Sequence, residues 1–511
     1  MNDKTTPATD SGTKDSGDIA ALAKGGRTNF LGFLLRLLAR LPFLFIGGRL
    51  YGAEALGRFA SALVIVELVA MVCTIGEKRG LAQRLSDNDC DEDDRRGGIA
   101  AGVVCDGLLT ALIAGSVIGL TLWLVPAPMF PSGIYTDWDR LIVLAIPALA
   151  LTEILLAAQA YRYDIATTVR SRAVVEPWTI SIMAGLLYFV IPDSGLSLAY
   201  LASIYAALLT AAIPFLRLYG LPQSWSPSFA RMRDLTLRGL PLAGADTIEW
   251  GTRRLDIFIL GLFASPAGVG VYYVAQQVAS LPQKLKTSFE PILGPVITRK
   301  LKEKDYAAIA RQVCQVGFWI TAAQAGIALA LGIPGEGIMG LVGPNFVGGT
   351  GALSFLLAAE VVAATAVVSE AALVYVARLR NLWISIGTIV LQGLLTVGVM
   401  LLANAYHVSD LYRAGGAALA LMTALAVSSI VKAMLLARLL NEPINNWRWS
   451  LLYAVAVAGL VGFLITRLPE WAELSLGVPA ILLSYGFVVW KKGFGPEDRV
   501  LFRKKLDTGE A

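Results

Sequence analysis

Long apolar stretches alternate with short polar breaks along almost the whole chain, from residue 28 to residue 490. A helix needs about 20 mainly apolar residues to cross the hydrocarbon core of a bilayer, and fourteen stretches are about that long. This pattern predicts an all-α polytopic membrane protein with about 14 transmembrane helices. The expected spans are residues 28–48, 54–76, 98–125, 139–161, 173–191, 196–218, 239–264, 267–291, 309–333, 351–376, 379–405, 411–435, 447–466 and 472–490.

Lysine and arginine are concentrated in every second connection between these spans, and such residues favour the cytoplasmic side. The basic segments contain Lys24 and Arg27; Lys78, Arg79, Arg84, Arg95 and Arg96; Arg162, Arg170 and Arg172; Arg217, Arg231, Arg233 and Arg238; Arg299, Lys300, Lys302 and Lys304; Arg378 and Arg380; Arg438 and Arg448; and Lys491, Lys492, Arg499, Arg503, Lys504 and Lys505. We therefore expect both termini to be cytoplasmic. The polar residues 1–27 are expected to be a disordered N-terminus, and residues 491–511 a basic cytoplasmic tail.

Composition narrows the class of function. Hydrophobic residues make up 56% of the chain and charged residues 16%, and the formal net charge of +5 belongs to the cytoplasmic loops rather than to a nucleic-acid surface. His407 is the only histidine, which excludes a histidine-based metal centre or catalytic triad. The sequence contains no GxxxxGK[ST] phosphate loop and no connection long enough for an ATPase domain or an outer catalytic domain. We therefore expect no cofactor, no ATP-driven pump and no enzyme.

The chain also contains a short internal repeat. The segment Tyr51-Gly-Ala-Glu-Ala-Leu-Gly-Arg-Phe-Ala is similar to Phe263-Ala-Ser-Pro-Ala-Gly-Val-Gly-Val-Tyr-Tyr, with Gly57 and Gly270 in register. Parallel repeats of this kind are a transporter architecture, with the site between the two halves. We predict an N-terminal six-helix bundle at 28–218, a cytoplasmic linker at 219–238, a C-terminal six-helix bundle at 239–440 and two additional transmembrane helices at 441–490.

Two segments resemble bacterial polysaccharide-export flippases. They are Arg49-Leu-Tyr-Gly-Ala-Glu-Ala-Leu-Gly-Arg-Phe-Ala-Ser-Ala and Gly340-Leu-Val-Gly-Pro-Asn-Phe. These flippases belong to the multidrug/oligosaccharidyl-lipid/polysaccharide superfamily. The resemblance implies two six-helix bundles in a V, as in MATE transporters, and translocation of undecaprenyl-pyrophosphate-linked oligosaccharide repeat units across the bacterial inner membrane for exopolysaccharide, O-antigen or capsule synthesis. It implies this cargo and membrane lipid as partners, together with a polymerase and glycosyltransferases of the same pathway.

Arginines inside the first span are candidates for binding a pyrophosphate. An arginine at the bilayer centre costs about 2.5–3.5 kcal/mol, so it is expected to face a bundle interior or a cavity. Arg36 and Arg40 lie one helical turn apart on one face, and the planar guanidinium can bind two phosphate oxygens at once. The alternative is that Arg36 reaches the cytoplasmic interface or pairs with Glu67 or Asp106.

The seventh span has the densest set of charges. Its stripe of three- and four-residue steps consists of Asp246, Glu249, Arg253 and Asp256, with Arg254 beside it. We assign Arg253 and Arg254 to substrate binding. The alternative is a self-neutralising stripe in which Glu249 and Arg253 form an i,i+4 ion pair.

Carboxylates in a dry environment have raised pKa values and can exchange protons near neutral pH. A carrier without an ATP site therefore has candidates for coupling to a proton or sodium gradient. They are Asp246, Glu249, Asp256 and Glu360. For each of them, a hydrogen bond or ion pair between helices is the alternative.

Three classes of function remain open from the sequence. The leading one is a flippase for lipid-linked oligosaccharides. The second is a lipid II flippase or a drug/cation exporter of the same superfamily, and the third is a membrane-bound synthetic enzyme or a non-transporting scaffold of a polysaccharide assembly complex. The arginines of the first and seventh spans favour an anionic cargo over a cationic one.

Overall fold

The computed structural model describes residues 41–87, 98–222, 225–283, 297–495 and 498, without the side chain of Glu249. In these residues the chain is mainly helical, with short π- and 3-10 segments, and contains no strand. Nine of the described helices are long and apolar enough to cross a membrane, and the apolar helix Trp449–Ile465 is somewhat shorter. The all-α polytopic fold that the hydropathy pattern predicts is therefore confirmed.

Each expected span coincides with a helix, or with a run of consecutive helices, in the described part of the chain. The first span is described from residue 41 and continues through η1 (Gly47–Tyr51). The others are α2 (Gly52–Cys73), α4 (Ile99–Leu124), α5–η2–α6 (Asp137–Arg140, Leu141–Leu144, Ala145–Tyr161), α7–η3–α8 (Ile165–Val169, Arg170–Val175, Glu176–Tyr188), α9 (Gly195–Tyr219), α10 (Phe229–Phe263), α11 (Pro266–Gln283), α13 (Tyr306–Gly332), α15 (Thr350–Val376), α16 (Arg378–Ala405), α17 (Asp410–Leu440), α18 (Trp449–Ile465) and α19–η6–α20–η7 (Glu470–Ala472, Glu473–Gly477, Val478–Val488, Val489–Gly493).

Three short helices lie in the connections between spans, where the sequence predicted none. They are α3 (Glu77–Asp87), α14 (Gly335–Val342) and η5 (Pro344–Gly349). In α3 the buried residues Glu77, Leu81 and Leu85 recur every four positions, so one face of this polar helix is buried. Such a helix is too short and too polar for a search that looks for apolar stretches of spanning length.

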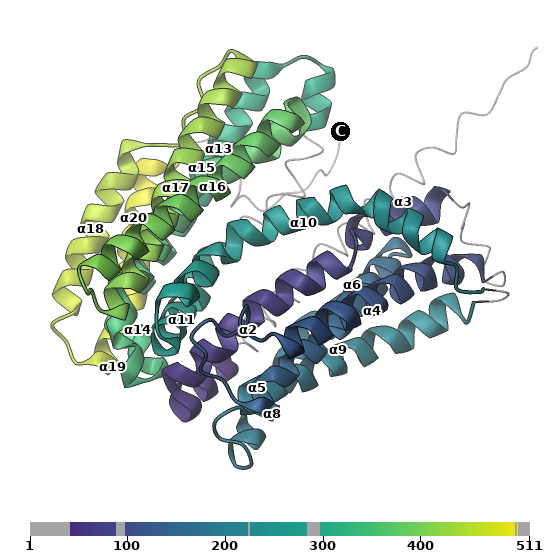
Figure 1. Ribbon diagram of the computed structural model, residues 1–511. Helices are drawn as coiled ribbons and strands as arrows, with labels where there is room; N and C mark the ends of the chain where they lie inside the picture. Colours follow the sequence, from purple (N-terminus) through teal and green to yellow (C-terminus); the bar gives the residue numbers. More distant parts are fainter. Residues whose placement is uncertain (1–40, 88–97, 223–224, 284–296, 496–497, 499–511) are drawn as a thin grey trace, which may run out of the picture. The chain divides into compact units, whose positions relative to one another are not determined.

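The chain divides into two compact units, and the first consists of Met1–Ile46, Ile65–Pro128 and Thr136–Thr247. Its helix α6 packs against both α4 and α9, and the three lie side by side in Figure 1. Small residues bring α4 and α6 close together, since a Cβ atom on Gly115 would lie 3.1 Å from Cα of Pro147. The approach of these backbones is typical of helix packing in membranes, where small residues line the contacts.

The second unit consists of Gly47–Val64, Met129–Tyr135 and Ile248–Ala511. One of its apolar clusters joins α13, α15 and α17, with Val313, Val368 and Leu436 fully or almost fully buried. A second cluster joins α13 to the last two spans through Phe318, Ala454 and Ile481. The thirteenth and fourteenth spans are thus attached to α13 rather than lying apart from the unit.

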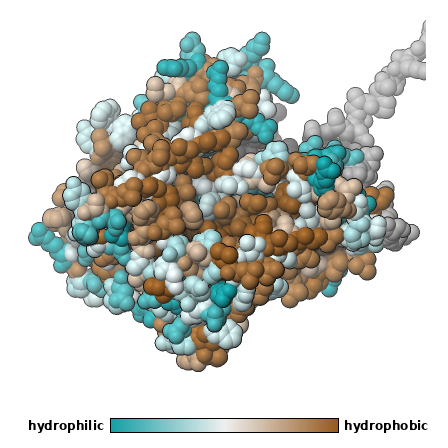
Figure 2. Space-filling model, in the orientation of Figure 1, coloured by the Kyte–Doolittle hydropathy of each residue, from teal (hydrophilic) through white to brown (hydrophobic). Residues whose placement is uncertain are grey.

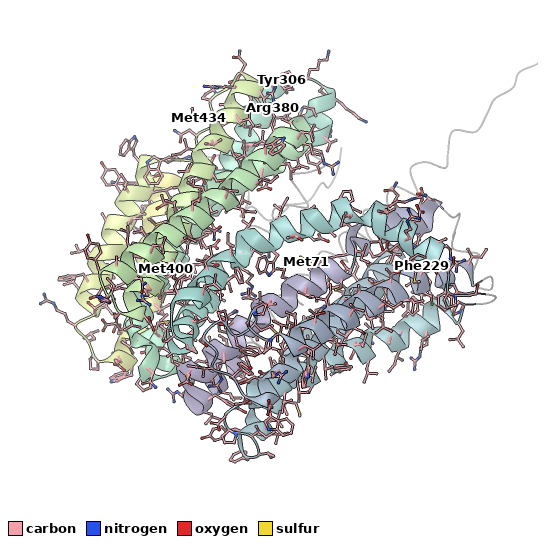
Figure 3. The ribbon with its side chains drawn as sticks, viewed as in Figure 1. Met71, Phe229, Tyr306, Arg380, Met400 and Met434 are labelled. Atoms are coloured by element: carbon pink, nitrogen blue, oxygen red, sulfur yellow. The ribbon has the colours of Figure 1, made fainter. Side chains whose placement is uncertain are left out.

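The consecutive helices α16 and α17 run antiparallel, as consecutive membrane spans must. Tyr306 at the start of α13, Arg380 near the start of α16 and Met434 near the end of α17 lie at one end of this unit in Figure 3. Met400, near the end of α16, lies toward the other end. Brown hydrophobic side chains cover much of the face seen in Figure 2, as a lipid environment requires.

The two glycines in register in the sequence are in contact within the second unit. A Cβ atom on Gly57 of α2 would lie 1.6 Å from the carbonyl oxygen of Pro266, and one on Gly270 of α11 would lie 2.0 Å from that of Ala53. The two helix backbones therefore touch at this point, and only glycine fits on either side.

Candidate functional site

The charged stripe of the seventh span lies on one continuous helix, because α10 remains helical from Phe229 to Phe263 and includes Pro241. Its described members have different environments. Asp246 is 2% exposed and Asp256 is 0% exposed, whereas the side chain of Arg253 is exposed. The two carboxylates are therefore enclosed by other elements, and the arginine is accessible.

Two side chains of α11 enclose the carboxylate of Asp256. The hydroxyl of Tyr272 donates a hydrogen bond to Oδ2 of Asp256, and Nε2 of Gln276 donates to the same oxygen at 3.1 Å. Tyr272 and Gln276 are one helical turn apart, so both project from the same face of α11. Tyr272 is fully buried, like Asp256.

Gln276 also contacts the two arginines of α10. Its Oε1 accepts a hydrogen bond from Nη1 of Arg254 at 3.0 Å, and its Nε2 lies 3.3 Å from the carbonyl oxygen of Arg253. A guanidinium only donates hydrogen bonds, so the amide oxygen of Gln276 must face Arg254 and its nitrogen must face Asp256. The second unit thus contains an ordered network that runs from Tyr272 through Asp256 and Gln276 to Arg254.

Asp246 has a different partner, in the first unit. Its Oδ1 lies 2.6 Å from Nε of Arg79 on α3. The adjacent Lys78 lies 3.5 Å from Oε2 of Glu153 on α6. Ion pairs therefore join α3 to both α10 and α6.

Further carboxylates of the first unit have arginine partners. Glu153 forms an ion pair with Arg172, which also lies 2.7 Å from Oε2 of Glu176. Asp106 on α4 lies 3.0 Å from Nε of Arg231, near the start of α10. The enclosed charges of this unit are thus compensated between helices, as buried ions must be.

The second unit contains a charge pair that the sequence interpretation missed. Lys432 of α17 is 4% exposed, and its Nζ lies 2.8 Å from Oε2 of Glu370 on α15 and 3.2 Å from Oγ of Ser385 on α16. One ammonium group therefore connects three helices. The signal that would have found it is a lysine inside the expected span 411–435, since charges within spans are rare.

The structure gives less information on the remaining predicted site residues. Glu360 is half-buried on α15. Arg36, Arg40 and the side chain of Glu249 lie outside the described residues. The substrate-binding and ion-coupling roles of all these residues stay predictions. Among the residues that the structure describes, no group of three or more His, Cys, Asp or Glu is arranged to hold a metal ion.

Comparison with known families gives one match. Residues 46–322, more than half of the chain, match the family described as "Polysaccharide biosynthesis protein". A comparison with curated protein sequences finds no significant match.

Solved transporter structures are similar in fold. The lipid II flippase MurJ in an inward closed conformation has a TM-score of 0.66 at 11% identity, covering 94% of this chain and 100% of that one. An inward-facing multidrug resistance MATE family transporter of the MOP superfamily has a TM-score of 0.63 at 15% identity, covering 79% and 94%. A MOP superfamily transporter from Pyrococcus furiosus has a TM-score of 0.55 at 14% identity, covering 82% and 95%. At such low identities the likeness shows the fold, which is that of these transporters.

Proposed function

The chain belongs to the polysaccharide biosynthesis protein family, and we propose that it is a flippase for undecaprenyl-pyrophosphate-linked oligosaccharide repeat units. It would translocate them across the bacterial inner membrane, with both termini in the cytoplasm, rather than catalyse a reaction. The family match over residues 46–322 carries this proposal, because it associates a transporter fold with polysaccharide synthesis. Polysaccharide units are assembled on lipid carriers, so a transporter in such a pathway has a lipid-linked cargo.

The chemistry of α10 supports an anionic head group. A pyrophosphate requires several hydrogen-bond donors, and a guanidinium binds two of its oxygens at once. Arg253 is exposed on α10, and the adjacent Arg254 is half-buried and held by Gln276. We include Arg36 and Arg40 of the first span in the same substrate-binding set.

A cationic cargo, as in a drug/cation exporter, is supported less well. Such a site requires carboxylates that are available to the cargo. Asp246 is paired with Arg79, and Asp256 accepts hydrogen bonds from α11. A lipid II cargo and a non-transporting scaffold are outcomes that the experiments below distinguish.

The energy supply is part of the proposal. Moving an anionic head outward is favoured by an inside-negative potential, at about 2.3 kcal/mol per elementary charge per 100 mV. The empty, arginine-bearing carrier has lost the counter-charge of the cargo, so we propose that a proton or sodium ion gates its return. The acidic residues would pair with Arg253 in one half of the cycle and bind the ion in the other. The candidate residues for this ion are Asp246, Glu249, Asp256 and Glu360.

Export in cells tests the function. We expect deletion of the gene to stop export of the polysaccharide and to leave the lipid-linked units on the cytoplasmic leaflet. Arg254→Ala should lower export about tenfold or more, since a charge-assisted hydrogen bond contributes about 1.5–3 kcal/mol, and Arg254→Lys should restore part of it. Arg217→Ala, which changes an exposed arginine at the end of α9, is the matched control and should export normally.

Two results would count against the proposal. Normal export after deletion of the gene would contradict the function itself. Normal export by both Arg253→Ala and Arg254→Ala, at unchanged protein level in the membrane, would contradict the assignment of the site to α10.

A further inference from the structure

We propose that Tyr272, Gln276 and Asp256 act as positioning residues that orient the guanidinium of Arg254 toward the pyrophosphate of the cargo. This inference rests on the proposed function and names the part of the second unit that determines recognition of the head group. It gives Asp256 a role in addition to the ion coupling proposed above.

The hydrogen bonds of the network have a fixed direction. Asp256 and Tyr272 are both fully buried, so the surrounding side chains hold the two groups in contact. The carboxyl group of Asp256 accepts from both Tyr272 and Gln276, and because Arg254 can only donate, the amide of Gln276 has one orientation between them. The oxygen of that amide is then presented to Nη1 of Arg254 at 3.0 Å.

Solvent exposure increases along the network. It begins at side chains with no solvent exposure and ends at Arg254, which is only half-buried. A buried polar group without a partner is costly, so the enclosed end of the network has one stable arrangement. The arginine at the other end takes its direction from that arrangement.

An arginine that is already oriented binds an anion at a lower entropic cost. A free arginine side chain samples many rotamers, and holding it in one geometry costs conformational entropy when the ligand binds. A network that fixes the guanidinium beforehand removes this cost from the binding step. The gain is largest for a ligand that uses the planar fork with two oxygens, and a pyrophosphate provides such oxygens.

A simpler interpretation is that the network only joins α10 to α11. In that case Tyr272 and Gln276 contribute to stability, and Arg254 is incidental to them. The two interpretations differ in whether the effect of Tyr272 on binding depends on Arg254, which a double-mutant cycle measures.

The experiment measures binding of undecaprenyl pyrophosphate, and of undecaprenyl phosphate for comparison, to the purified full-length protein in detergent. Tyr272→Phe retains the buried ring and removes only the hydroxyl. We expect it to weaken binding of the pyrophosphate lipid about tenfold, as loss of support for a charged hydrogen bond would, and to weaken binding of the monophosphate lipid less. Gln276→Met, which is close in shape, should have the same effect.

The control and the cycle separate positioning from stability. Tyr219→Phe removes a buried tyrosine hydroxyl that donates to the carbonyl oxygen of Ala158 in the first unit, and should leave lipid binding unchanged. Arg254→Lys should weaken binding by itself, and Tyr272→Phe should then add less than a twofold further loss.

Three results would decide against the inference. If Tyr272→Phe weakened binding by the same factor with arginine and with lysine at position 254, the network would be structural only. The inference would also fail if both Tyr272→Phe and Gln276→Met bound like the wild type. If the wild-type protein bound neither lipid, the proposed function itself would fail, and this inference with it.

Discussion

Asp498 is the last residue that the structure describes, and its side chain contacts residues of two other helical segments. Its carboxylate accepts hydrogen bonds from Arg448 at 2.6 Å, from the indole of Trp319 at 2.9 Å, from the backbone amide of Gly495 at 2.9 Å and from the side chain of Gln315 at 3.3 Å. The guanidinium of Arg448 also lies 3.9 Å from the ring centroid of Phe318. One carboxylate thus attaches the segment after the last span to α13 and to the start of α18.

This contact predicts a pH-dependent effect on stability. Burial raises the pKa of Asp498, but the hydrogen bonds and the charge of Arg448 outweigh it and hold the pKa below its ordinary value. A carboxyl group with a lowered pKa stabilises the folded state above its unfolded value, near 3.9, and loses that contribution as the pH falls through the folded value. Asp498→Asn should therefore lower the melting temperature at pH 7 and pH 5, and the difference should shrink as the pH falls below about 3.9, the ordinary value of the carboxyl group.

Scanning fluorimetry of the detergent-solubilised protein checks this prediction. Asp137→Asn is the control, because the side chain of Asp137 is 95% exposed and its pair with Arg140 is 3.6 Å long. Exposed pairs of this kind contribute little. Equal melting temperatures of Asp498→Asn and the wild type at pH 7 would contradict the role of Asp498.

At the residue scale the sequence indicated where charged side chains lie along the helices but not what they contact. The spacing of Asp246 and Asp256 correctly placed both on one helix. It did not reveal that Asp246 pairs with Arg79, because α3 was not among the expected helices. Nor did it reveal the contact of Asp256 with Tyr272, because such pairings depend on how α10 and α11 are turned toward each other.

At the scale of elements, the contact between α2 and α11 offers a prediction. Gly57→Ala places a methyl group where the carbonyl oxygen of Pro266 lies, at 1.6 Å, so one of the two backbones must move. We expect this variant to lose most of its folded yield in the membrane, since overpacking without room to relax typically costs about 1–3 kcal/mol or more. Fluorescence-detected size-exclusion chromatography of the solubilised protein measures the yield.

The matched control is another glycine inside a membrane helix. A Cβ atom on Gly398 of α16 meets nothing within 4 Å, so Gly398→Ala should be tolerated or slightly stabilising, by about 0.5–1 kcal/mol in helix propensity. If Gly57→Ala and Gly398→Ala gave the same yield, the close contact between α2 and α11 would be refuted.

Elements of spanning length were predictable, and shorter ones were not. Hydropathy alone located the spans, including α10 with its charged residues, because about 20 apolar residues leave few alternatives. The helices α3 and α14 lack such a stretch, and their helical state depends on what they pack against. In α3 the ion pairs of Lys78 and Arg79 with other helices are part of that packing.

At the scale of the whole molecule, the sequence predicted the fold class and the family. It did not reveal that α2 and α10 each pass from one compact unit to the other, since this depends on contacts between distant segments. The grouping into six-helix bundles at 28–218 and 239–440 stays a prediction.

The orientation of the chain is also testable. Cysteines that replace Lys78 and Lys300 in a cysteine-free background should both react with a membrane-impermeant reagent only when the cytoplasmic face is accessible. The expectation follows from the concentration of lysine and arginine in the connections that contain them. Labelling of these two positions from opposite sides would refute the topology.

The central claim is that the chain moves a lipid-linked oligosaccharide across a bilayer. The most direct measurement uses proteoliposomes that contain the purified protein and a fluorescent undecaprenyl-pyrophosphate-linked oligosaccharide, with a quencher that reaches only the outer leaflet. We predict that the wild-type protein equilibrates the label between the leaflets, and that Arg254→Ala does so about tenfold more slowly, in line with the loss of a charge-assisted hydrogen bond. Equilibration by the wild type no faster than in protein-free liposomes would contradict the account.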